Sequence, residues 1–158
     1  KLLRRGASLE YRQSETGDTP LIYAARRDKR STGSRLVQLG ADTRAANNKG
    51  ETALMLAAQS GMLKLTRDIL ATRPEINARN QKQETALMIA ATKGQSEIAT
   101  ALIKAGADLL LTDAFNKTAS ARAADSTNYS LRWSLEEAEK LALQKQFENS
   151  YKKLRPGG

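Results

Sequence analysis

A repeat with a period of 33 residues is the feature that most constrains what this 158-residue chain can fold into. Four related segments, each with a threonine two residues after its start, begin at Gly17, Gly50, Gln83 and Asn116. A second anchor, Gly-Ala-Asp at residues 40–42 and 106–108, keeps the same register. Self-similarity at this spacing is typical of units that stack and share a core, so it predicts a solenoid.

Each unit is predicted to be a pair of helices. The threonine hydroxyls can cap the free N–H groups of a starting inner helix, at Thr19, Thr52, Thr85 and Thr118. Pro20 fits the first helical position. Gly61 and Gly94 supply a positive-φ turn, after which an apolar outer helix follows. The residues expected to be buried between units are Leu54, Ala57, Ile69, Leu87, Ala90 and Leu102.

The composition agrees with helices. Hydrophobic residues make up 40% of the chain, which is enough to bury a core, whereas aromatic residues make up only 4%. Alanine and leucine favour helices that pack closely through small side chains. We therefore expect an all-α protein.

The repeated segments and the alanine pairs that follow each threonine resemble the ankyrin repeat, whose pattern is Gly-x-Thr-Pro-Leu-His-x-Ala-Ala-x-x-Gly, an outer helix and a Gly-Ala-Asp loop. The resemblance covers about residues 1–125. It implies an all-α solenoid of helix-turn-helix units, which we expect a C-terminal helix to cap. The expected divisions are the end of a partial unit at 1–13, three units at 14–46, 47–79 and 80–112, a degenerate fourth unit at 113–130, and a C-terminal helix and tail at 131–158.

Three departures from the family pattern predict local differences. The family's histidine, which ties adjacent loops together, is replaced in the four units, so we expect that bracing to be lost; the replacements are Ile22, Met55, Met88 and Ala121. Arg73-Pro74 stands in place of Gly-Ala, which predicts strain or a different loop path. Residues 28–34 lack apolar side chains, so we expect a shortened outer helix and a mobile loop there.

The two ends of the array are predicted separately. Residues 1–7 have the pattern of the last turn of an outer helix and its loop. Ser134 and Glu137 form an apparent capping box, stapled by Trp133, which predicts a helix starting at that point. An apolar stripe continues along this helix at Leu143, Phe147, Tyr151 and Leu154. We expect it to be a lid that closes the last unit, with a partner-binding helix as the alternative.

The chain has no histidine and no cysteine, which removes imidazole bases, thiolate nucleophiles and the commonest zinc ligands. Glu136, Glu137 and Glu139 cluster, but on the expected first turn of a helix, where acids favour the helix dipole. We expect no catalytic residue, no metal and no cofactor, and so a protein that is not an enzyme. No stretch approaches the roughly 20 apolar residues that span a bilayer, so no membrane insertion is expected.

The formal net charge of +9 raises nucleic acid or another anionic polymer as a partner. Basic residues are interleaved with acids along most of the chain, and few aromatic residues could stack on bases. A folded protein is therefore the favoured partner and nucleic acid is the alternative. By itself the chain is expected to be monomeric. The bacterial periplasm and the cytoplasm both remain compatible with the sequence.

The resemblance implies where a partner would bind, because ankyrin arrays make contact through the loop tips before each inner helix and through the concave face of that helix. The tip positions here are Glu15, Thr16, Asp18, Asn48, Lys49, Glu51, Gln81, Lys82, Glu84, Phe115 and Lys117. The concave helix positions are Arg26, Arg27, Gln59, Ser60, Thr92 and Lys93. Arg26 and Arg27 are expected to contact carboxylates of the partner, and their loss is expected to leave stability nearly unchanged.

The variants at residues 52–55 and 85–91 look like those of bacterial members of the family, some of which inhibit or protect enzymes. This resemblance implies a binding module, and most concretely an inhibitor or protective partner of an enzyme with an acidic site.

Overall fold

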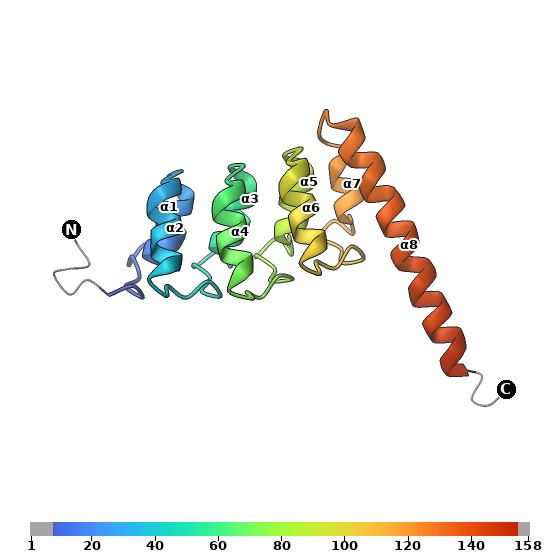
Figure 1. The fold of residues 1–158 in the computed structure, drawn as a ribbon, viewed down its shortest axis with the longest axis horizontal. Coiled ribbons are helices and arrows are strands. Elements are labelled where there is room, and N and C mark those ends of the chain that lie inside the picture. The colour runs from blue at the N-terminus through green and yellow to red at the C-terminus, as the bar shows by residue number, and fades with distance from the viewer. Residues whose placement is uncertain (1–7, 155–158) are drawn as a thin grey trace.

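The computed structural model describes residues 8–154, and within that range the chain forms eight helices and no strand (Figure 1). The helices are α1 (Pro20–Arg26), α2 (Arg30–Gln38), α3 (Ala53–Gln59), α4 (Leu63–Ala71), α5 (Ala86–Thr92), α6 (Ser96–Lys104), α7 (Ala119–Ala123) and α8 (Tyr129–Leu154). The predicted all-α class is confirmed. The expectations for residues 1–7 and for the end of the chain after residue 154 lie outside the described residues.

The helices stack in two rows. The inner helices α1, α3, α5 and α7 pack one against the next, and α2, α4 and α6 form the outer row beside them (Figure 1). Buried alanines, such as Ala24 and Ala25 in α1 and Ala57 and Ala58 in α3, let inner helices approach closely. The result is the predicted solenoid of helix-turn-helix units.

The predicted helix starts are confirmed. Each of the four threonines accepts a hydrogen bond from the backbone N–H three residues later, at 3.3–3.4 Å. Gly61 and Gly94 adopt φ of 67° and 68° in the turn between inner and outer helices, where a residue with a β-carbon is strained. The equivalent turn of the first pair is made by Asp28, with φ 53°.

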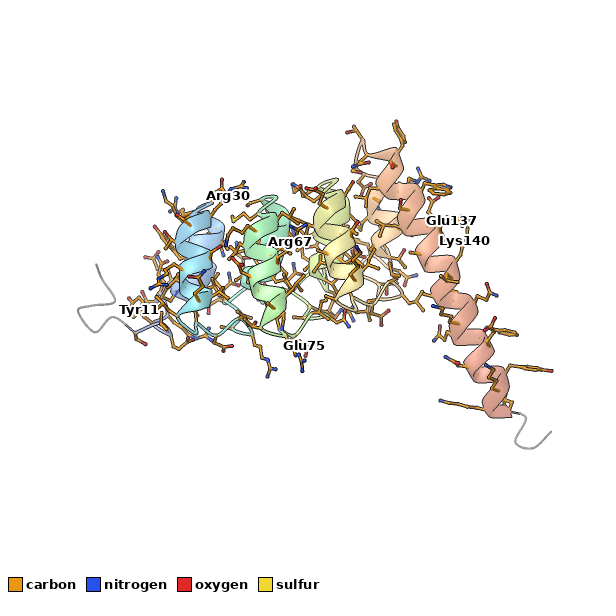
Figure 2. All side chains as sticks on the ribbon, viewed as in Figure 1. Tyr11, Arg30, Arg67, Glu75, Glu137 and Lys140 are labelled. Carbon is orange, nitrogen blue, oxygen red and sulfur yellow. The ribbon has the colours of Figure 1, made fainter. Side chains whose placement is uncertain are left out.

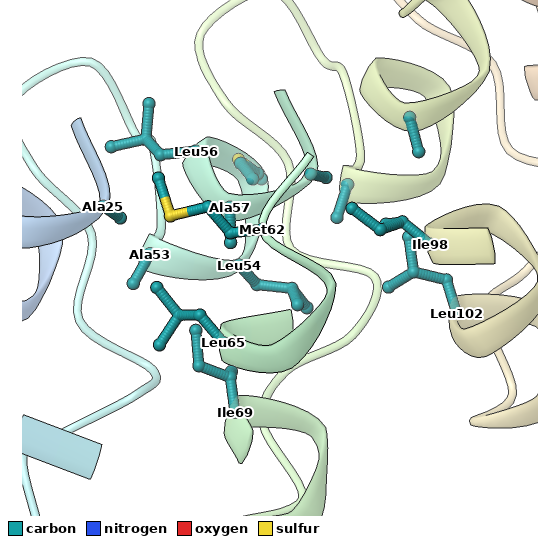
Figure 3. Close-up of a cluster of buried hydrophobic side chains, with 14 of the residues drawn as sticks. Ala25, Ala53, Leu54, Leu56, Ala57, Met62, Leu65, Ile69, Ile98 and Leu102 are labelled. Carbon is teal, nitrogen blue, oxygen red and sulfur yellow. The ribbon is translucent and has the colours of Figure 1, made fainter. Parts of the chain in front are cut away.

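The core runs continuously between the rows. All six residues predicted to be buried there have exposed fractions of 2% or less. Figure 3 shows Leu54 and Ala57 of α3 gathered with Leu65 and Ile69 of α4, beside Leu102 of α6. Burying large aliphatic side chains contributes about 1.5–3 kcal/mol each, so this shared core accounts for the stacking.

The prediction of a shortened helix at residues 28–34 is wrong. The helix α2 has nine residues, as α4 and α6 have. Small residues form its inner face: Gly33 and Ser34 are buried, and a β-carbon added at Gly33 would lie 2.8 Å from a methyl group of Leu65. Arg30, at the start of the helix (Figure 2), also reaches the carbonyl oxygens of Ser60 and Gly61, both at 3.4 Å. Close packing through small residues thus replaces the missing apolar side chains.

The loop at Arg73-Pro74 follows the same backbone path as the equivalent loops of the neighbouring units. Arg73 adopts φ of 54°, and Gly40 and Gly106, 33 residues before and after it, also have positive φ. A non-glycine residue in this region carries a strain of about 1 kcal/mol or more. Of the two predicted outcomes, strain is therefore the correct one.

The start of the C-terminal helix was predicted wrongly. Helix α8 begins at Tyr129, and Asn128 caps it by accepting a hydrogen bond from the N–H of Leu131 at 3.1 Å. Ser134 lies inside the helix, where its hydroxyl donates to the carbonyl of Ser130 at 2.9 Å. The apparent capping box is therefore no cap, because an asparagine six residues earlier provides the stronger start signal.

The lid prediction holds for the first part of α8 only. Leu131 and Leu135 are buried, and α8 packs against α7, closing the array. The predicted apolar stripe is exposed instead, with fractions of 50–81%; its residues are Leu143, Phe147, Tyr151 and Leu154. Figure 1 shows this half of the helix standing clear of the helix pairs, so it cannot cover the last unit.

Candidate functional site

The loops before α3, α5 and α7 are each folded around one side chain that was not predicted from the sequence. The Oδ1 atom of Asn47 accepts hydrogen bonds from the N–H groups of Lys49 and Glu51, at 2.9 and 3.0 Å. Asn80 and Asp113 make the same pair of bonds in the next two loops. The spacing of 33 residues between these three side chains was the signal that could have revealed them.

Adjacent loops are tied together although the family's histidine is absent, because backbone hydrogen bonds link each tip to the next. The N–H of Asn48 donates to the carbonyl of Thr16 at 3.0 Å, and that of Gln81 donates to Lys49 at 3.0 Å. The N–H of Ala114 donates to Lys82 at 3.1 Å. The tips therefore form a connected ladder without the family's histidine.

Arg26 and Asp18 were both predicted to face a partner, but they form an ion pair with each other. The guanidinium of Arg26 donates to both carboxylate oxygens of Asp18, at 2.8 and 3.0 Å, and to Glu51 at 2.9 Å. The Asp18 side chain is only 1% exposed. The Asp18 carboxylate is thus buried beneath Arg26, and the contact of Arg26 with Glu51 joins α1 to the loop before α3.

A second arginine does the same at the other end of the array. Arg122 of α7 forms ion pairs with Asp113, whose side chain is fully buried, and with Glu84 at 3.2 Å. Arg122 was not among the predicted residues, because it lies three residues before the position equivalent to Arg26. We call each contact between successive inner helices a step. Of the three steps, the first (α1 to α3) and the last (α5 to α7) are thus bridged by an arginine.

The pKa shifts follow from these bridges. Burial opposes ionisation of Asp18, but hydrogen bonds from Arg26 and Asn47 outweigh it and lower the pKa of the carboxyl below its usual value. The pKa of Glu51 is lowered in the same way, by Asn47 and Arg26 against burial. For Asp113, burial is outweighed by backbone N–H groups and Arg122, so its pKa is lowered too. These acids are held ionised.

Among residues 8–154, no arginine bridges the middle step, from α3 to α5. Gln59 occupies the position equivalent to Arg26, and Ile89 occupies the position equivalent to Arg122. Without a guanidinium between the units, a groove of about 340 Å³ remains open on the concave face. We call it the central groove, and its lining residues are Lys49, Glu51, Gln59, Asn80, Gln81, Lys82, Glu84, Ile89, Thr92 and Lys93.

Eight of the residues predicted from the sequence line this groove together. Its carboxylates are already compensated, Glu51 by Arg26 and Glu84 by Arg122. Within the described part of the chain, Lys82 and Lys93 form no ion pair, and both are exposed. The excess charge at the rim of the groove is therefore positive.

The other predicted residues lie outside the groove. Glu15 and Ser60 are exposed at its N-terminal side, and Thr16 is half-buried in the tip ladder. The guanidinium of Arg27 lies over the ring of Tyr23 at 5.6 Å, exposed and without a carboxylate partner among the described residues. At the far end, the exposed Phe115 lies under Arg122, and Lys117 pairs with Asp125 at 3.5 Å; Asn48 is exposed on the ladder.

Two further features bear on what the site can do. Among residues 8–154, no group of three or more acidic side chains is placed to hold a metal ion. In the same range, no helix is both long and apolar enough to cross a membrane.

The stacked helix pairs, the loop ladder and the concave groove define a helical-repeat binding protein. Two family models match the chain: ankyrin repeats (3 copies) over residues 1–80, and ankyrin repeats (many copies) over residues 69–123. The chain belongs to the ankyrin-repeat family, whose repeats are protein–protein interaction modules and typically non-catalytic scaffolds. A search among curated proteins found no match.

Proposed function

We propose that the central groove binds an acidic segment of a folded partner protein. The observation that carries this proposal is the missing arginine at the middle step, which leaves the concave face open between α3 and α5. At the neighbouring steps, the chain fills the same space with its own guanidinium groups.

The charges around the groove support an acidic partner. Glu51 and Glu84 are paired within the chain, so Lys49, Lys82 and Lys93 are the charges left for a ligand. Electrostatic complementarity of this kind directs association and excludes partners of like charge. Ile89 adds an apolar contact on the groove wall, where a side chain next to the acidic residue could be buried.

The more specific proposal is that the partner is an enzyme with an acidic site, which the chain inhibits or protects. The support is the resemblance of residues 52–55 and 85–91 to bacterial members of the family, together with a rigid, basic groove that suits a carboxylate-bearing cleft. Addition of the chain in equimolar amount to the captured enzyme should then change its turnover. An enzyme that binds the chain with unchanged turnover would contradict inhibition and leave only the binding module.

Capture from native lysate followed by mass spectrometry would identify the partner, and titration calorimetry with that purified protein tests the groove. Lys82→Glu together with Lys93→Glu should weaken binding at least about tenfold, because both charges oppose an acidic ligand after reversal. Lys104→Glu, which reverses an exposed charge at the end of α6 outside the groove, is the matched control. Equal affinity of the double variant and the control would refute the groove proposal.

Nucleic acid remains the second candidate, because of the net charge of +9. A fluorescent DNA duplex is a direct probe. Contacts to about six phosphates would lower its affinity by roughly 10³-fold between about 50 and 200 mM salt. Tight duplex binding with this salt dependence would favour the second candidate over a protein partner.

A further inference from the structure

The outer row of helices carries a second groove, which lies between α2 and α4 and has a volume of about 460 Å³. No residue that lines it also lines the central groove. It is therefore a separate site from the one proposed to bind a partner protein. We call it the outer groove, and its lining residues are Arg30, Ser31, Ser34, Arg35, Gln38 and Lys64.

The outer groove is lined by side chains that can donate hydrogen bonds. They are three cationic side chains, two serines and one glutamine, and no carboxylate is among them. The central groove differs, because Glu51 and Glu84 line it together with its three lysines. The outer groove therefore suits an anion whose oxygen atoms accept several hydrogen bonds.

The two arginines of the outer groove keep donors free for a ligand. Arg30 uses three of its five N–H donors, on Asp28 and on two backbone carbonyls. The guanidinium of Arg35 donates only to Gln38, at 3.3 Å, and forms no ion pair within residues 8–154. Both side chains of the Arg30–Asp28 pair are more than half exposed, so this pair is weak and leaves Arg30 available.

The third cation, Lys64, reaches from α4 to a buried side chain of α2. Its ammonium group donates to the hydroxyl of Ser34 at 3.3 Å and to Asp68 at 2.8 Å, which leaves one of its three N–H donors. Ser34 is only 6% exposed, so this contact holds the end of Lys64 against α2. The three cations thus come from two helices and line one space.

The repeat register shows that these charges belong to the first helix pair only. Arg35 and Lys64 correspond to Asp68 and Glu97 one unit later, so the equivalent positions between α4 and α6 carry acids. The close packing of α2 on α4 depends on small side chains and not on these cations. A ligand therefore explains the cations better than the fold does.

We propose that the outer groove binds an oligophosphate group, meaning a chain of two or three linked phosphates. Guanidinium groups bind phosphate oxygens in pairs, and Lys64 adds a point charge. Arg30 and Arg35 lie about 7.5 Å apart along the helix axis, which exceeds the size of a single phosphate and fits a chain of them. The volume of the groove lies in the range of small-molecule sites.

Titration calorimetry of the full chain with sodium tripolyphosphate, at about 150 mM salt, tests the site. A dissociation constant of about 100 µM or tighter is expected, with orthophosphate at least about tenfold weaker, because a single phosphate reaches fewer of the cations. Tripolyphosphate binding no tighter than that of orthophosphate would overturn the proposal. Adenosine triphosphate distinguishes a free phosphate chain from a nucleotide: an equal or lower affinity shows that the phosphate chain alone is bound, and a higher affinity shows that the nucleoside contributes.

Two double variants test the residues. Arg35→Gln with Lys64→Gln should weaken tripolyphosphate binding at least about tenfold, because it removes two of the three cations without adding a carboxylate. Arg67→Gln with Lys104→Gln is the matched control, since it removes the same charges from exposed positions of α4 and α6 that do not line the groove. Thermal melting followed by circular dichroism checks that both variants fold. Equal weakening by the two pairs would mean that only the net charge attracts the anion, and would overturn the proposal.

Chemical-shift mapping by nuclear magnetic resonance on the isotope-labelled chain locates the bound anion. The largest changes with tripolyphosphate are expected at the amides of residues 30–38 and 63–68. Changes centred on Lys82 and Lys93 would place the phosphates in the central groove and overturn the proposal. A DNA duplex that binds at least about tenfold tighter than tripolyphosphate, and loses that affinity in Arg35→Gln with Lys64→Gln, would assign the outer groove to nucleic acid and overturn it too.

Discussion

At the scale of single residues, two adjacent arginines of α1 have different tasks. Arg26 is 32% exposed and bridges Asp18 to Glu51, whereas Arg27 is exposed and contacts only the ring of Tyr23. Both looked like free concave-face residues in the sequence, because the repeat register gives a position but not the partners of a side chain. The buried carboxylate of Asp18 decides the difference.

Arg26→Ala should therefore destabilise the chain by about 1–3 kcal/mol, since it leaves the buried Asp18 carboxylate without its ion pair. Arg27→Ala is the matched control, with an expected change within about 0.5 kcal/mol. Urea unfolding followed by circular dichroism measures both. Equal free energies of unfolding for the two variants would mean that the Arg26 bridge contributes nothing to stability.

Asp113 provides a pH test of the other bridge. Its folded pKa is lowered, so the stabilisation it gives is present above its unfolded pKa and is lost as pH falls through the folded value. Asp113→Asn keeps the acceptor for the loop N–H groups and places there the residue that Asn47 and Asn80 supply in the other loops. The wild type should be more stable than the variant at about pH 7, and the difference should shrink below about pH 4.

The measurement for this prediction is urea unfolding at several pH values from about 7 to about 2. Because the chain has no histidine, the loss of stability should begin only where carboxyl groups take up protons. A constant difference between wild type and Asp113→Asn over the whole range would show that the Asp113 charge is not linked to folding.

At the scale of helices, the sequence predicted most where a residue type has one conformational role. The threonine caps and the turn glycines at 61 and 94 were placed correctly, since each satisfies a local backbone requirement. Packing roles were harder to predict. In α2, the lack of apolar side chains at residues 28–34 suggested a shortened helix, yet Gly33 and Ser34 are the residues that let the helix approach α4. A pattern of apolar residues does not reveal a face built from small ones.

The candidate site shows the same limit. The tip and concave positions followed from the register, and eight of them line one groove. The groove itself depends on which arginines fold back on the chain, which is a property of side-chain contacts between units. The repeat register predicts that Gln59 and Lys93 lie on the concave face, where they line the groove, but it does not reveal that Arg26 closes the neighbouring step.

Hydrogen exchange tests the corrected view of α2. The amides of residues 33–38 should be protected at least about a hundredfold more than exposed amides of the tip loops, because α2 is a complete helix packed on α4. Residues 66–71 of α4 serve as the internal reference. Rapid exchange throughout α2 with strong protection in α4 would restore the mobile segment that the sequence suggested.

At the scale of the whole molecule, the array is a row of three steps between inner helices with an arginine at the first and the last. In a solenoid, stability is approximately a sum of units and of contacts between neighbours, and the middle step lacks the ion pair that an arginine adds at the other two. It is also where the central groove lies. Natural binding sites commonly sacrifice stability in this way, and the groove is proposed to be such a site.

Gln59→Arg should close that step, because an arginine at 59 stands to Glu51 and Glu84 as Arg26 stands to Asp18 and Glu51. A partly buried bridge of this kind is expected to stabilise the array by about 0.5–1.5 kcal/mol and to raise the melting temperature by a few degrees. The same side chain would fill the groove and weaken binding of the partner at least about tenfold, despite the added positive charge.

Ser60→Arg adds an equal charge at the exposed neighbouring position and should change neither property. Thermal melting and titration calorimetry on both variants check the pair of effects. A Gln59→Arg variant that is more stable but binds as tightly as the wild type would show that the middle step is open for a reason other than binding.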